Sequence, residues 1–127
     1  MLSASPVTAT LPVRDLERAQ SFYASRLGLR LLSGSVKEGH LAFGAGEGTS
    51  LQLFESESDQ KSDNTAATFE VADLAAEMAE LRRKDVSFEE YDLPGLKTVE
   101  GVATMGDHRA AWFKDPDGNV LCLHEGP

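Results

Sequence analysis

The chain contains two segments that resemble each other, and this internal repeat constrains its fold more than any other feature. Leu11–Leu16 and Phe69–Leu74 lie 58 residues apart, and each passes from alternating apolar residues through Val-x-Asp-Leu into a helical pattern. A second pair, Gly48–Leu53 and Gly118–Leu123, places a glycine before an alternating strand. The repeat predicts two halves, each made of a strand, a helix and three further strands.

The predicted helices begin at matched aspartates. Asp15 and Asp73 are good N-caps, because a carboxylate accepts the free amide hydrogens of the first helical turn. Gly28 is a typical residue for ending the first helix. Apolar residues at helical spacing then form one buried face on each helix: Leu16, Ala19, Tyr23 and Leu27 in the first, and Leu74, Met78 and Leu81 in the second.

The predicted organisation is a single domain over residues 1–127. Module one covers about residues 6–57 and module two about residues 64–126, with the polar run Ser56–Asn64 as the linker. The predicted class is α/β (α+β), with two βαβββ modules that form an eight-stranded open cup around a cleft. The glycine- and proline-containing stretch Asp92–Gly106 is expected to be a loop beside the site, in the position of a lid.

Strand alternation predicts which side chains face the cleft. In the first strand, Val7, Ala9, Leu11 and Val13 are expected to meet the helix, which leaves Thr8 and Thr10 for the cleft. The repeat places three residues of the second module in the same way: Ala66, Thr68 and Glu70. In the closing strands, the cleft residues are predicted to be Gln52, Phe54, Cys122 and His124.

Two adjacent aromatic residues, Trp112 and Phe113, must point to opposite faces of their strand. We assign Phe113 to the core and Trp112, the single tryptophan, to the cleft. Phe54, Tyr91 and Trp112 could then form aromatic walls for a planar ligand, although they could equally fill the cleft themselves.

The charge balance argues against nucleic acid as a partner. Asp and Glu number 21 against 12 Lys and Arg, and the resulting net charge of −9 repels phosphate backbones. The single cysteine excludes an internal disulfide. Residues 1–6 contain neither a basic cluster nor an apolar run, so we expect no signal peptide, no membrane association and a cytoplasmic location.

The remaining reactive residues have ordinary explanations. His40 and His108 lie beside glycines, where surface or structural roles are expected. Cys122 and His124 could form a thiolate–imidazole pair, but residues two apart on a strand are nearly 7 Å apart at the backbone. A buried, unreactive thiol is the favoured interpretation.

Two stretches, Leu11–Tyr23 and Ala111–Asn119, resemble the vicinal oxygen chelate superfamily, which includes glyoxalase I, extradiol dioxygenases and bleomycin-resistance proteins. The segment Phe88–Thr98 is similar to a bacterial subgroup usually left without an assigned reaction. The resemblance implies the glyoxalase/bleomycin-resistance fold described above. It also implies a homodimer, since relatives of this length usually pair two chains.

The resemblance further implies four cleft positions for the ligands of a divalent metal, at Thr8, Gln52, Ala66 and Cys122. Thr8 is a poor ligand, Ala66 has no donor atom, and one amide with one thiol does not complete a site. We therefore expect no metal and no cofactor.

The predicted function is metal-independent binding of a small molecule. The protein would sequester or carry an aromatic metabolite or an antibiotic, as in antibiotic resistance, and we expect a binding protein rather than an enzyme. The predicted ligand-binding residues are Thr8, Thr10, Gln52, Phe54, Ala66, Thr68, Tyr91, Trp112, Cys122 and His124.

Two alternatives stay open. The first is a divalent-metal-dependent lyase, isomerase or dioxygenase that uses other ligands, such as Glu55, Glu70, His124 or Glu125. The second is a structural dimerisation module.

Overall fold

Each half of the chain forms its own sheet in the computed structural model, which describes residues 1–57 and 62–127. The chain divides into two units, Met1–Gln60 and Lys61–Pro127, and the boundary falls within the predicted linker. Part of that linker, residues 58–61, lies outside the described residues. That the two units make up a single domain stays a prediction.

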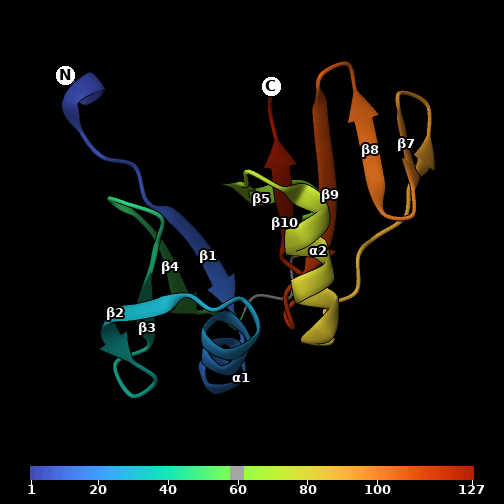
Figure 1. Ribbon diagram of the computed structural model, residues 1–127. Coiled ribbons are helices and arrows are strands. Elements are labelled where there is room, and N and C mark those ends of the chain that lie inside the picture. The colour runs from blue at the N-terminus through green and yellow to red at the C-terminus, as the bar shows by residue number, and fades with distance from the viewer. Residues whose placement is uncertain (58–61) are drawn as a thin grey trace. The chain divides into compact units, whose positions relative to one another are not determined.

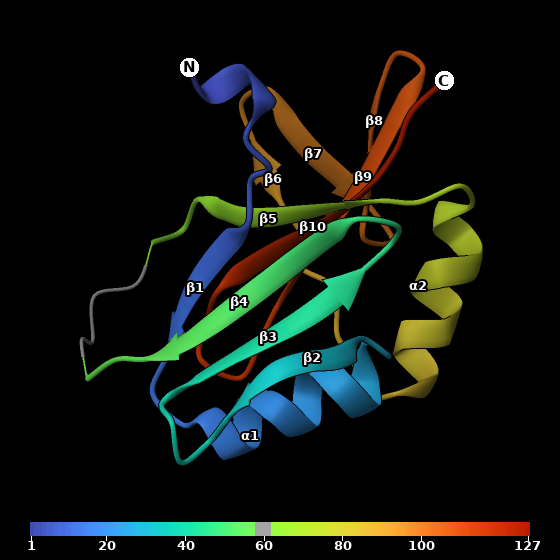
Figure 2. The ribbon, with the colours of Figure 1, turned by 90° about the vertical axis from the view of Figure 1, so that its left-hand side faces the viewer.

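The first unit has the predicted order of elements (Figures 1 and 2). Its four-stranded sheet has the order β1-β4-β3-β2, with β1 parallel to β4. Its α-helix continues directly into a π-helix, and both follow the first strand. The bounds are 3₁₀-helix η1 Leu2–Ala4, β1 Ala9–Val13, α1 Leu16–Ser21, π-helix η2 Phe22–Arg26, β2 Arg30–Ser35, β3 His40–Ala45 and β4 Thr49–Glu55.

The core of the first unit follows the predicted alternation along β1 and β4, except at the start of the chain. Leu11 and Val13 are buried, but Val7 is 88% exposed, because β1 begins only at Ala9. The expectation that Val7 meets the helix is therefore wrong. Phe22 and Tyr23, the first two residues of the π-helix, are both buried, so two consecutive aromatic side chains pack into the core.

The second unit has more strands than the repeat predicts. Its six-stranded sheet has the order β5-β10-β9-β8-β7-β6, with β5 parallel to β10 and the other pairs antiparallel (Figure 1). The bounds are β5 Thr65–Glu70, α2 Leu74–Arg83, β6 Asp92–Leu93, β7 Leu96–Val99, β8 Val102–Met105, β9 His108–Lys114 and β10 Val120–Glu125.

The extra strands come from Asp92–Gly106, the stretch predicted to be a loop. It forms the hairpin β6–β7 and then β8, so the prediction of a loop is wrong and the two sheets together contain ten strands rather than eight. Gly95 and Gly101 make the reversals between these strands at φ of 80° and 85°, a conformation that side chains with a Cβ rarely adopt. The glycines that suggested a loop are therefore turn residues between short strands.

The matched helix starts are confirmed. The carboxylate of Asp15 accepts a hydrogen bond from the Arg18 amide at 3.0 Å, and that of Asp73 accepts one from the Ala76 amide at 3.1 Å. The mixed α+β class is confirmed as well. Within the described residues, no helix has the length and hydrophobicity needed to cross a membrane.

The sheet of the second unit has one face covered by α2, which packs against β9 and β10 (Figure 1). Phe113 and Leu121 are fully buried, and they pair across β9 and β10. Their neighbours Trp112 and Cys122 also pair, on the opposite face. This opposite face carries the candidate site of the second unit.

Candidate binding site

A pocket of about 410 Å³ lies within the second unit. Its volume is in the range of small-molecule sites. Three segments provide its walls: the start of β5, the segment that leads through β6 into β7, and the facing ends of β9 and β10. The lining residues are Asp63, Asn64, Thr65, Glu89, Tyr91, Leu93, Leu96, Trp112, Lys114 and Val120.

Two aromatic rings form one wall of this pocket. The Tyr91 and Trp112 rings meet edge to face, with centroids 5.7 Å apart and planes at 83°. The indole Nε1 of Trp112 donates a hydrogen bond to the Thr65 hydroxyl at 3.1 Å. This bond holds the indole ring in one orientation at the pocket wall.

Charged side chains stand at the same pocket. Lys114 Nζ lies 3.6 Å from a Glu89 carboxylate oxygen, and the Glu89 amide donates to the Trp112 carbonyl at 2.8 Å. Burial, followed by the nearby Glu89 charge, raises the pKa of the Tyr91 phenol, so this hydroxyl is neutral at pH 7 and can donate a hydrogen bond. The pocket thus combines apolar rings with a few polar groups, as small-molecule sites do.

The Tyr91 segment is held in place by Glu90. One Glu90 carboxylate oxygen accepts hydrogen bonds from the Thr98 hydroxyl at 2.6 Å and from the Gly101 amide at 2.9 Å. The Thr98 oxygen in turn accepts from the Tyr91 amide at 2.8 Å. These bonds connect Glu90 and Tyr91 to Thr98 in β7 and to Gly101 in the turn between β7 and β8. We call Glu90, Thr98 and Gly101 the Glu90 clamp.

The Glu90 clamp predicts a pH-dependent contribution to stability. The Thr98 hydroxyl, followed by the Gly101 amide, lowers the pKa of Glu90. A lowered folded-state pKa means that the stabilisation is present above the unfolded pKa of about 4.3 and is lost as pH falls through the folded value. We expect E90Q to melt below the wild type at pH 7, with the gap closing under acid conditions, and E90A to melt lower still. Thermal unfolding followed by circular dichroism measures this; a gap unchanged between pH 7 and pH 3 contradicts it.

Three of the predicted site residues form a row across the open face of the sheet. Trp112 pairs with Cys122, and Cys122 pairs with Thr68 on the other side. Cys122 is only 5% exposed, and burial raises the pKa of its thiol. Both ring nitrogens of His124 have other hydrogen-bond partners, His108 and Glu70. The structure therefore does not form the thiolate–imidazole pair, and it agrees with a buried, unreactive thiol.

Ala66 does not take the place that alternation predicts for it. The register between β5 and β10 shifts at this point, so Val120 pairs with Thr65 and Leu121 with Ala67. Ala66 is the extra residue of this bulge. Thr65, rather than Ala66, therefore faces the pocket beside Trp112.

The first unit holds the other predicted residues on its own sheet. Gln52 pairs with Thr10 on β1, and Phe54 is exposed on the same face of β4 as Gln52. Thr8 precedes β1, and its hydroxyl lies 3.3 Å from the Ser50 hydroxyl. That these four residues bind a ligand stays a prediction.

The four positions that the resemblance marks for metal ligands do not fit a divalent ion. Ala66 has no donor atom, the Cys122 thiol is buried with a raised pKa, and the Thr8 hydroxyl is paired with another hydroxyl. Gln52 offers one neutral amide. Across residues 1–57 and 62–127, no group of three or more His, Cys, Asp or Glu side chains is placed to hold a metal ion.

Sequence reasoning missed most of the pocket. Asn64, Thr65 and Glu89 carry no motif, and they reach Trp112 only through contacts between distant parts of the chain. Lys114 lies two residues after Trp112 on the same face of β9, so strand alternation could have found it. It also missed that His108 contacts His124. The β9–β10 register creates this contact, because it pairs His124 with Ala110, which lies two residues from His108 on the same strand face.

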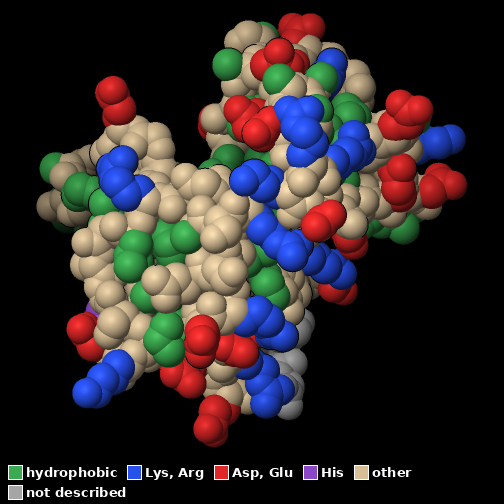
Figure 3. Space-filling model, turned by 60° about the horizontal axis from the view of Figure 1, so that its bottom comes forward, with side chains coloured by type: hydrophobic (Ala, Val, Ile, Leu, Met, Phe, Trp, Pro, Cys, Tyr) green, Lys and Arg blue, Asp and Glu red, His purple; other side chains and the backbone are tan. Residues whose placement is uncertain are grey.

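Acidic and basic side chains are mixed over the face of the molecule in Figure 3, and hydrophobic side chains form small groups among them. A nucleic-acid surface would instead concentrate basic residues. That the protein has no nucleic-acid partner stays a prediction, which depends on the net charge of −9.

The chain belongs to the Glyoxalase/Bleomycin resistance protein/Dioxygenase superfamily, whose family model matches residues 5–123. The resemblance of the Leu11–Tyr23 and Ala111–Asn119 stretches is thereby confirmed. No curated protein sequence matches the chain closely enough to count as a relative.

Solved structures extend this result. TnmS3, an antibiotic binding protein from Streptomyces sp. CB03234, is 26% identical with a TM-score of 0.74, over 100% of this chain and 99% of its own. A superfamily member from Sphaerobacter thermophilus DSM 20745 is 25% identical with a TM-score of 0.73, over 98% and 99%. The fosfomycin resistance protein FosX from Mesorhizobium loti, at 20% identity and a TM-score of 0.68 over 100% and 95%, shares the fold.

Proposed function

We propose that the protein binds a planar aromatic small molecule without a metal ion, in the pocket of the second unit. The observation that carries this proposal is the Trp112–Tyr91 wall, in which the indole is oriented by its bond to Thr65. Aromatic rings held in a fixed geometry stack on planar ligands with little loss of side-chain entropy.

Similarity to TnmS3 supports an antibiotic, or an aromatic metabolite of similar shape, as the ligand. The two chains align over almost their whole lengths. Binding would then sequester or carry the compound rather than transform it. Phe54, Thr10 and Gln52 would contribute if the two units share one cleft, as the sequence predicts.

The metal-dependent alternative receives less support from the residues proposed for it. Glu125 accepts a hydrogen bond from the Leu74 amide at 2.8 Å, in the first turn of α2, and also lies 3.9 Å from Arg109 Nε. His124 is bonded to Glu70. Glu125 therefore serves α2 and Arg109, and among the described residues none of these side chains belongs to a group of three or more metal ligands.

The proposal predicts a fluorescence response that does not depend on metal. A panel of planar aromatic antibiotics and metabolites should contain compounds that change the emission of Trp112, because it is the single tryptophan and lines the pocket. The response should be the same after treatment with a chelator. A ligand whose binding requires added Zn²⁺, Ni²⁺, Fe²⁺ or Mn²⁺ would contradict metal independence, and a panel without any response would remove the support for the pocket.

The homodimer and the cytoplasmic location are part of the same proposal. A symmetric pair of chains would cover the open sheet faces that each unit leaves opposite its helix.

A further inference from the structure

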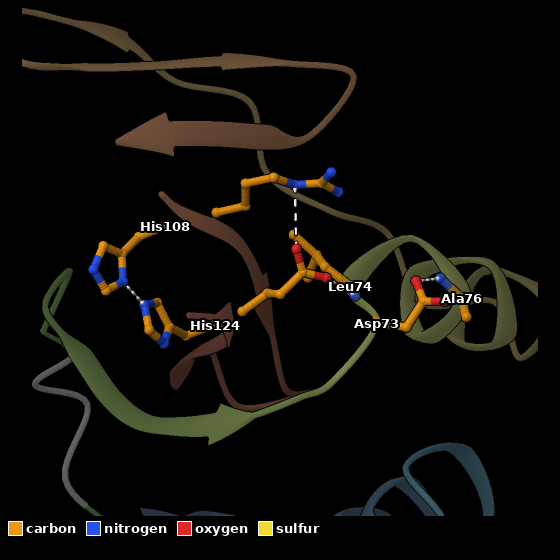
Figure 4. Close-up of polar contacts among 7 residues, drawn as sticks. Asp73, Leu74, Ala76, His108 and His124 are labelled. Atoms are coloured by element: carbon orange, nitrogen blue, oxygen red, sulfur yellow. Dashed lines mark hydrogen bonds and ion pairs between the residues drawn. The ribbon is translucent and has the colours of Figure 1, made fainter. Parts of the chain in front are cut away.

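Two histidines and a glutamate meet at the ends of three neighbouring strands, on the sheet face opposite α2. His108 Nδ1 lies 2.9 Å from His124 Nε2, and His124 Nδ1 lies 2.5 Å from a Glu70 carboxylate oxygen. Figure 4 shows the contact between the two rings. Glu70 pairs with His124 across β5 and β10. None of the three residues lines the pocket described above.

The carboxylate determines where His124 can carry its proton. A carboxylate only accepts hydrogen bonds, so Glu70 requires the proton of His124 to be on Nδ1. The Nε2 atom of a neutral His124 then has its lone pair directed at His108 Nδ1. One proton on the line between these two nitrogens satisfies them, as in a hydrogen bond between nearly parallel rings. A metal ion can replace that proton from a point beside the line when both rings turn so that their lone pairs converge on it.

The distance between the two nitrogens suits such an ion. Two imidazole nitrogens at about 2.0–2.1 Å from one metal, and about 90° apart, lie roughly 2.9 Å from each other. Tetrahedral coordination would need the pair to open by about 0.4 Å. His124 would also have the carboxylate partner on its other nitrogen that commonly supports metal-bound histidines.

Space and access are available beside the pair. Gly126 lies next to both rings, and a Cβ atom there would stand 3.4 Å from His124 Cε1 and 3.8 Å from His108 Nδ1. The His124 side chain is 25% exposed and His108 is exposed. Position 126 therefore places no side chain against the two rings, and both rings reach solvent.

We propose that His108 and His124 form a site for a divalent transition-metal ion that favours imidazole, with Glu70 as the residue that positions His124. Water completes the coordination, since two protein ligands leave most positions open. The class of ion is Ni²⁺, Cu²⁺ or Zn²⁺; Mg²⁺ and Ca²⁺ prefer oxygen ligands. The site differs from the four family positions, and it does not depend on the proposed binding of an aromatic ligand.

Calorimetric titration of the full chain, free of any histidine tag and stripped with a chelator, tests the site with Ni²⁺ and Zn²⁺. We expect saturable binding of one ion per chain and none of Mg²⁺. H108A should abolish saturable binding, E70Q should weaken it about tenfold or more, and H40A, which removes the remaining histidine, should leave it unchanged.

Circular dichroism of each variant checks the fold, and H108A is the decisive variant because the side chain it truncates is exposed. Absence of saturable Ni²⁺ and Zn²⁺ binding by the wild type overturns the proposal. Unchanged affinity in H108A, or an equal loss in H40A, overturns it as well. Unchanged affinity in E70Q overturns the positioning role of Glu70.

Discussion

Replacing Phe113 by alanine should lower the free energy of unfolding by about 3–5 kcal/mol. The Phe113 side chain is fully buried on the sheet face that α2 covers. Its ring meets the Phe88 ring edge to face at 5.7 Å, and a β-bridge joins the two residues. Truncation leaves a cavity among well-packed side chains, and the structure around it relaxes only in part. Urea unfolding followed by far-ultraviolet circular dichroism measures the change.

The neighbouring residue provides the matched control for this experiment. W112A removes an even larger side chain, but from the opposite face and from a partly exposed position. Its loss of stability should therefore be clearly smaller than that of F113A. If W112A unfolds the protein while F113A lowers its stability only slightly, Trp112 faces the core and Phe113 faces the open side of the sheet. Every residue placed on the open face of β9 must then be reassigned.

The second large effect concerns ligand binding. For a compound identified by the fluorescence response, W112A should weaken binding by at least about 2 kcal/mol, or roughly thirtyfold in Kd. The reason is that the indole lines the pocket and is held by Thr65 and Tyr91. Calorimetry is the appropriate measurement, because this variant has no tryptophan to observe.

W112F separates stacking from the hydrogen bond. Phenylalanine keeps an aromatic face but cannot donate to the Thr65 hydroxyl, so W112F should fall between the wild type and W112A. If W112A binds the compound as tightly as the wild type does, the ligand does not contact this wall, and the proposed pocket is wrong.

The features that sequence reasoning predicted correctly depend on neighbours along the chain. Asp15 and Asp73 cap their helices because a capping carboxylate reaches only the first turn that follows it. Trp112 and Phe113 lie on opposite faces because strand alternation has a period of two. Family membership was also evident from local stretches at the two ends of the chain.

The features that sequence reasoning missed depend on how distant strands pair. The bulge at Ala66 places Thr65 beside Trp112, and no propensity reveals a register shift of one residue. The turns at Gly95 and Gly101 look like loop signals until the strands around them are seen to pair.

The same distinction explains the two sites. By itself, the sequence determined that Trp112 is an aromatic residue away from the core of its strand. The tertiary structure decided that Tyr91 meets it and that the Glu90 clamp holds Tyr91 there. It also brought His108 to His124, because a contact across strands is set by register, which depends on the pairing of the whole sheet rather than on either residue.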